Sequence, residues 1–115
     1  MISNRFDVAG KVVVITGGGQ GIGREYALAF AEATAVPVVA ELDEQNGQSV
    51  VSEIEEKGGE ALAVKTDVTS EEAVRRMVNV TMKKFGRIDI LINNAALFAV
   101  LPKCNFEDIP LDEWS

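Results

Sequence analysis

The sequence predicts an α/β fold with three layers, in which helices cover both faces of a doubly wound parallel sheet. Four short and nearly continuous apolar runs alternate with longer segments whose apolar residues recur every three or four positions. Strands buried on both faces of a sheet show continuous runs, whereas covering helices show the longer period. The first run also leads directly into a turn with five glycines in eight residues, 16–23. Strands and helices that alternate in this way form a parallel sheet with right-handed crossovers.

The apolar runs predict strands at residues 12–15, 38–40, 61–64 and 88–92. The expected spatial order of these strands is 3-2-1-4, with a ligand crevice between the first and the fourth. Pro37 enters the second strand, and proline is tolerated at the first residue of a strand because its missing N–H matters least there. The sequence after the fourth run predicts no fifth strand, so the sheet is expected to be truncated there.

Helices are predicted for residues 22–33, 44–57 and 70–85. Thr69 and Glu72 have capping-box spacing at the start of the third helix, and Gly86 stands where a left-handed C-terminal residue belongs. Apolar residues at helical spacing are expected to face the sheet. They are Ile22, Tyr26, Phe30 and Ala33 in the first helix, Val50, Val51 and Ile54 in the second, and Val74, Met77, Val78, Met82 and Phe85 in the third.

Composition and charge narrow the classes of partner. The 115 residues suffice for a single domain, 1–115, and the 47% hydrophobic content predicts a packed core. A net charge of −7 with scattered basic residues argues against nucleic acid as a partner. One cysteine and no histidine predict no metal site. No run reaches the ~18–20 apolar residues of a membrane span, and Asp7 interrupts the place of a signal peptide, so a cytoplasmic location is expected.

The glycine-rich turn, residues 16–23, lies between the first strand and the first helix. Such a turn brings bare backbone to a helix N-terminus, whose unpaired N–H groups and dipole favour an anion such as a pyrophosphate. Side chains at Gly17, Gly21 and Gly23 would hold the ligand away or push the helix off the sheet. The fingerprint G-x-G-x-x-G fails in every frame. The P-loop pattern fails at Arg24 and Glu25, which replace its lysine and its serine or threonine.

The spacing T-G-x-x-x-G-x-G resembles that of the short-chain dehydrogenase/reductase family, and three further signals agree. Gly10-Lys11 leads into the first strand, Asp67-Val68 follows the third, and residues 93–96 (NNAA) resemble the family's N-N-A-G. The resemblance implies a Rossmann-like NAD(P)-binding domain, and hydride transfer between an alcohol and a ketone by the complete protein, which is expected to be a homo-oligomer. It implies no catalytic residue within this chain, whose catalytic half is expected to lie beyond Ser115.

The residues expected to bind the cofactor come from the strand ends and the glycine-rich turn. They are Gly17, Gly19, Gln20, Gly21, Ile22, Gly23, Glu41, Leu42, Asp67, Val68, Asn94, Ala95 and Ala96. Glu41 lies 20 residues after Gly21, near the distance at which an acid accepts hydrogen bonds from the adenosine ribose. Its charge would repel a 2′-phosphate, and Gln20, Leu42 and Asp43 supply no cation, so NAD is favoured over NADP. Alternatively, Glu41 and Asp43 simply cap the next helix.

The family resemblance assigns roles to the other polar strand-end residues. Asp67 would contact the adenine amino group with Val68 packed on the ring, or Asp67 would only form a turn. Asn93 would tie neighbouring strands together with Thr16 as a partner, and Asn94 and Ala95 would bring their backbone against the cofactor ribose. Thr34 and Ala96 depart from the family pattern, because each replaces a glycine.

Catalysis and substrate are less visible in the sequence. Tyr26 is the sole tyrosine and is followed four residues later by Phe30, so it does not form the family's Tyr-x-x-x-Lys pair and is expected to pack in the core. Leu97, Phe98, Val100 and Leu101 suggest an apolar alcohol or ketone as substrate, but they could equally pack beneath a helix that this chain lacks. Two alternatives stay open: a non-catalytic dinucleotide-binding or regulatory module, and nucleotide hydrolysis through a degenerate P-loop.

Overall fold

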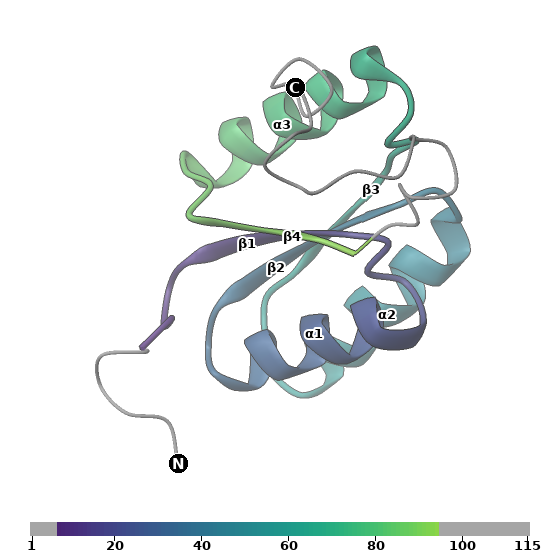
Figure 1. The fold of residues 1–115 in the computed structure, drawn as a ribbon. Helices are drawn as coiled ribbons and strands as arrows, with labels where there is room; N and C mark the ends of the chain where they lie inside the picture. Colours follow the sequence, from purple (N-terminus) through teal and green to yellow (C-terminus); the bar gives the residue numbers. More distant parts are fainter. Residues whose placement is uncertain (1–6, 95–115) are drawn as a thin grey trace.

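The computed structural model describes residues 7–94 and forms a four-stranded parallel sheet with helices on both faces (Figure 1). The elements in chain order are β1 (Val12–Thr16), α1 (Gly21–Glu32), β2 (Val36–Glu41), α2 (Glu44–Glu56), β3 (Leu62–Lys65), α3 (Glu71–Phe85) and β4 (Ile90–Asn93). The strand order is β3-β2-β1-β4, and all three pairings are parallel. The predicted fold class and strand order are therefore confirmed.

The sheet separates two apolar cores. Helices α1 and α2 cover one face and α3 covers the other (Figure 1). Alternation along β1 sends Val13 and Ile15 into the core beneath α1 and α2, and Val12 and Val14 into the core beneath α3. Both faces of β1 are buried, which explains why its sequence is a continuous apolar run.

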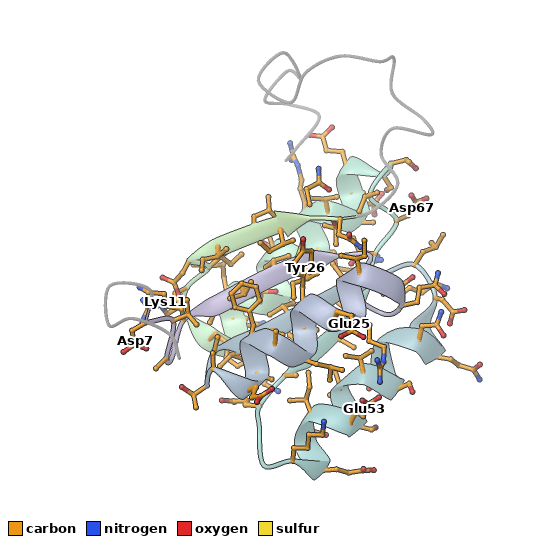
Figure 2. The ribbon with its side chains drawn as sticks, turned by 60° about the horizontal axis from the view of Figure 1, so that its bottom comes forward. Asp7, Lys11, Glu25, Tyr26, Glu53 and Asp67 are labelled. Atoms are coloured by element: carbon orange, nitrogen blue, oxygen red, sulfur yellow. The ribbon has the colours of Figure 1, made fainter. Side chains whose placement is uncertain are left out.

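Helix α1 packs on the sheet through smaller residues than its apolar pattern predicts. Gly23 and Ala27 are its buried residues, whereas Ile22 is 65% exposed and Tyr26 is 42% exposed. The expectation that Tyr26 packs in the core is therefore wrong, and Figure 2 shows its side chain beside α1. Small side chains on the sheet-facing side let the helix approach β1 closely, and this rotates the larger apolar side chains toward solvent.

Helix α3 differs from expectation at its N-terminus and on its buried face. Ser70, not Thr69, is the N-cap, and its hydroxyl accepts a hydrogen bond from the Ala73 amide at 3.1 Å. Met82 is 44% exposed, whereas Thr81 is fully buried. The buried hydroxyl of Thr81 donates a hydrogen bond to the Met77 carbonyl at 2.8 Å. A buried hydroxyl satisfied within its own helix is compatible with an apolar core. Gly86 ends the helix in the left-handed conformation, as predicted.

Two residues near the start of β2, Thr34 and Pro37, are unusual for their positions. Thr34, after α1, has a positive φ of 66°, which is costly for a residue with a Cβ. Pro37 is fully buried as the second residue of β2, one position later than expected. Within residues 7–94 no helix combines the length and the hydropathy that crossing a bilayer requires.

Candidate functional site

The carboxyl ends of β1, β2, β3 and β4 surround a cavity of about 370 Å³. Seven predicted cofactor-binding residues line it, namely Gly17, Gln20, Glu41, Leu42, Asp67, Val68 and Asn94. Asp67 lies at the opposite end of the sheet from Asp7 and Lys11 (Figure 2). The fold thus brings residues far apart in the sequence to one edge, where parallel α/β sheets bind ligands.

Three lining residues were not selected from the sequence: Ala40, Thr66 and Thr69. Ala40 precedes Glu41, and Thr66 and Thr69 lie within two residues of Asp67. Their proximity to these two strand-end acids could have indicated that they line the site. Conversely, Gly19, Gly21, Ile22 and Gly23 do not line the cavity but belong to the turn and to the start of α1. Ala95, Ala96, Leu97, Phe98, Val100 and Leu101 lie outside the described residues.

The glycine-rich turn depends on backbone shapes and contacts that exclude side chains. Gly17 and Gly21 have positive φ values of 66° and 58°. A Cβ on Gly23 would overlap the Gly17 carbonyl oxygen and lie 2.6 Å from the Asn94 Nδ2. Helix α1 begins at Gly21, and the side chain of its N-cap, Gln20, makes no capping hydrogen bond. The turn therefore presents a helix N-terminus without a side-chain cap, an arrangement that suits an anionic group.

Glu41 ends β2 with its side chain turned toward the glycine-rich turn. The residue is only 8% exposed, and its Oε1 accepts a hydrogen bond from the Gly19 amide at 3.0 Å. Its Oε2 accepts from the Asp43 amide, also at 3.0 Å. The cap of α2 is Asp43, which accepts from the Asn46 amide at 3.1 Å. The helix-capping interpretation thus holds for Asp43 but is wrong for Glu41.

Asp67 forms the turn that follows β3. Its Oδ1 accepts hydrogen bonds from the Thr69 hydroxyl at 2.6 Å and from the Thr69 amide at 2.9 Å. The hydroxyl bond, followed by the amide bond, holds the pKa of the Asp67 carboxyl below its ordinary value. The turn-forming interpretation is confirmed, and the ionised carboxylate still lines the cavity.

Thr16 joins the end of β1 to the end of β4, as expected. Its hydroxyl lies 2.9 Å from the Asn93 Oδ1, and it accepts a hydrogen bond from the Asn94 amide at 3.0 Å. The Asn94 Nδ2 then donates to the Gly17 carbonyl at 3.3 Å. The buried Nδ2 of Asn93 has no partner within residues 7–94. Asn94 therefore fixes one wall of the cavity to Gly17 in the glycine-rich turn.

The groups around the cavity are those of a crevice that can hold a polar ligand. Backbone amides, an ionised aspartate, a buried glutamate and an amide side chain surround the cavity. In the part of the chain from 7 to 94, no three or more His, Cys, Asp or Glu side chains are grouped to hold a metal ion. Such a set can orient a polar molecule that carries both hydroxyl groups and negative charge.

Comparisons with known proteins agree with this geometry. Residues 11–115 match the family model described as short chain dehydrogenase. The chain is 47% identical over 105 residues to an uncharacterized oxidoreductase of Thermotoga maritima, covering 91% of this chain and 40% of that protein. The chain thus spans well under half the length of this curated relative.

Solved structures show the same likeness. A 7α-hydroxysteroid dehydrogenase, complexed with NADH and 7-oxo-glycochenodeoxycholic acid, superposes with a TM-score of 0.78 at 38% identity, covering 97% of this chain and 43% of that one. A short chain dehydrogenase/reductase from Burkholderia phymatum, in complex with NAD, superposes with a TM-score of 0.72 at 34% identity, covering 75% and 31% of the two chains. The chain therefore belongs to the short chain dehydrogenase family of oxidoreductases.

Proposed function

We propose that residues 1–115 form one Rossmann-like domain that binds NAD, and that the protein transfers hydride between NAD and an alcohol or ketone. The observation that carries this proposal is the cavity at the carboxyl edge of the sheet, where the glycine-rich turn meets Glu41, Asp67 and Asn94. Two family members that superpose on the chain were solved with NADH or NAD, which supports the same cofactor here.

The residues around the cavity fit the parts of a dinucleotide. Gly17 and the uncapped start of α1 would hold the pyrophosphate through backbone N–H groups. Glu41 would accept hydrogen bonds from the adenosine ribose, because each of its oxygens uses one bond to an amide and keeps acceptor capacity. Asp67 and Val68 would contact the adenine, and Asn94 with Ala95 and Ala96 would border the second ribose.

The buried charge of Glu41 favours NAD over NADP. A 2′-phosphate within ~4 Å of this carboxylate would cost about 1–4 kcal/mol, depending on the effective dielectric constant. Since about 1.4 kcal/mol corresponds to a tenfold change in affinity, we expect NAD to bind at least about fivefold more tightly. No basic residue lines the cavity within residues 7–94 to receive the phosphate.

The bound nicotinamide would supply or accept the hydride, and the residues assigned above would bind and orient it. We assign no proton-transfer role to them, because the sole tyrosine, Tyr26, is partly exposed and does not line the cavity. The bile-acid derivative bound by the 7α-hydroxysteroid dehydrogenase supports an apolar substrate for this protein too. We also propose that the complete protein is a homo-oligomer and that it is located in the cytoplasm.

Calorimetric titration with NAD, NADP and ATP tests the binding step. We expect saturable binding of NAD, weaker binding of NADP, and no dependence on magnesium. Magnesium-dependent binding of ATP with no binding of NAD would contradict the proposal and favour a nucleotide triphosphatase.

The catalytic step requires a separate assay of the full-length protein. Incubation with NAD and a panel of apolar secondary alcohols should produce NADH, recorded by its absorbance. NAD binding without turnover of any alcohol or ketone would instead favour a non-catalytic dinucleotide-binding module.

A further inference from the structure

Gly19 differs from Gly17 and Gly21 in the reason it carries no side chain. Gly17 and Gly21 have positive φ values, whereas Gly19 does not. A Cβ on Gly19 would lie 2.7 Å from the Glu41 Cγ and 2.8 Å from its Oε1. It would also lie 2.9 Å from the Asn46 Cβ. The space that a side chain at position 19 needs is therefore filled mainly by the side chain of Glu41.

The same pair of residues is joined by a hydrogen bond. The Gly19 amide donates to the Glu41 Oε1 at 3.0 Å, and the Asp43 amide donates to the Oε2 at the same distance. Each oxygen thus has one fixed donor, which sets the plane of the carboxylate in a residue that is only 8% exposed. Glu41 also lines the cavity, and each of its oxygens keeps acceptor capacity.

We propose that Gly19 is a specificity-determining residue, which sets the preference for NAD over NADP by positioning the Glu41 carboxylate. This inference rests on the proposed function, because it concerns how the same site distinguishes the two dinucleotides. Gly19 acts as a positioning residue: its missing side chain makes room for Glu41, and its amide holds the carboxylate against the turn. A larger residue at position 19 moves the charge away from the ribose site.

The geometry also predicts a compensating substitution. Glu41→Ala removes both the Cγ and the carboxylate that fill the space next to Gly19. A methyl group at position 19 should then be tolerated better, with the Asn46 Cβ left to shift. The effect of Gly19→Ala on selectivity should thus depend on whether the Glu41 side chain is present.

The test is a double-mutant cycle on the full-length protein, with dissociation constants for NAD and NADP measured by calorimetry. The variants are Gly19→Ala, Glu41→Ala and their combination. We expect Gly19→Ala to lower the ratio of NAD to NADP affinity by about tenfold. In the Glu41→Ala background, the same change should lower that ratio by less than about threefold, because no carboxylate is left to position.

Gly47→Ala is the matched control. Its added Cβ would contact the Glu41 Cβ at 3.5 Å and the Ala63 Cβ at 3.4 Å, without reaching the carboxylate. This variant should keep the wild-type selectivity. A general effect of glycine substitutions near Glu41 would change the ratio here too, and that result would count against the role of Gly19.

Two outcomes overturn the inference alone: an unchanged ratio in Gly19→Ala, or equal losses in both backgrounds while the wild type binds NAD. If Gly19→Ala does not fold, the double variant decides. Its folding with the selectivity of Glu41→Ala supports the steric role of Glu41, and its failure to fold refutes that role. A wild-type protein that binds neither dinucleotide would reject the proposed function itself, and this inference with it.

Discussion

Thr34 holds a left-handed backbone conformation directly after α1, with a φ of 66°. A residue with a Cβ costs about 1–2 kcal/mol there, whereas glycine adopts the conformation freely. We expect Thr34→Gly to raise the free energy of unfolding by about 1 kcal/mol, measured by urea denaturation. Gly58 provides the converse control, because it has a φ of 85° with open space around it. Gly58→Ala should lower the same free energy, and two changes of equal sign would contradict this account.

Gly23 belongs to the packing of α1 against the turn. An added methyl group would overlap the Gly17 carbonyl oxygen and crowd the Asn94 side chain. We expect Gly23→Ala to cost about 1–3 kcal/mol of stability and to weaken NAD binding, because the turn must move. Thermal unfolding and calorimetry measure the two effects. A variant with wild-type stability and affinity would show that the turn does not need this close contact.

The sequence alone indicated that Thr34 is unusual at its position, but it did not predict the pairing of Gly19 with Glu41. Thr34 stands at a helix end where a glycine is usual, so a local pattern sufficed. The contact between Gly19 and Glu41 joins residues 22 positions apart, and it depends on the direction in which the glutamate side chain turns. Side-chain directions of this kind follow from tertiary packing, which a single sequence does not display.

Strand β1 is tied to the start of β4 through Asp89. Its Oδ2 accepts a hydrogen bond from the Val12 amide at 2.9 Å, and its carboxylate pairs with the Arg87 guanidinium. The bond from Arg87, followed by the bond from Val12, lowers the pKa of the Asp89 carboxyl below its ordinary value of 3.8. A carboxyl group with a lowered pKa in the folded state stabilises the fold above its unfolded-state pKa, and the contribution is lost as the pH falls through the folded value.

Asp89→Asn keeps an acceptor for the Val12 amide and removes the charge. We expect a lower free energy of unfolding at pH 7, and a difference from wild type that shrinks as the pH falls below about 4. Urea denaturation at pH 7 and pH 3 measures it. Glu60→Gln, which removes an exposed charge elsewhere, should show no such change. A difference that stays constant with pH would contradict a role for the ionised carboxylate.

The strands were predictable because each is short, apolar and buried, so the pattern is contained in the segment itself. The orientation of α1 was not predictable in the same way. A count of large apolar residues favours the side with Ile22 and Tyr26, whereas close contact with the sheet needs Gly23 and Ala27. The cap of α3 differed for a related reason, because Thr69 and Ser70 are adjacent candidates and Asp67 engages the first.

The sheet of residues 7–94 has β4 at one edge, where it pairs with β1 alone. Leu91 in this strand is 50% exposed, although its neighbours along β1 are buried. An edge strand with exposed apolar side chains is a template for pairing with another chain. We therefore expect copies of the 115-residue chain to associate through the β4 edge.

We expect Leu91→Lys to reduce concentration-dependent association of the 115-residue chain, measured by light scattering. A charged side chain on an edge strand opposes pairing between chains. Val80→Lys is the control, because Val80 is 38% exposed on α3, away from the edge. Equal reductions in the two variants would point to net charge rather than to the strand edge.

The amide of Gly19 is a built-in spectroscopic reporter of this crevice. An N–H that donates to a buried carboxylate is more strongly polarised than one that donates to a neutral oxygen. Its proton should resonate downfield of the other glycine amides and exchange slowly with deuterium. Because that resonance belongs to the protein, occupancy of the crevice could be followed by NMR before any substrate has been identified.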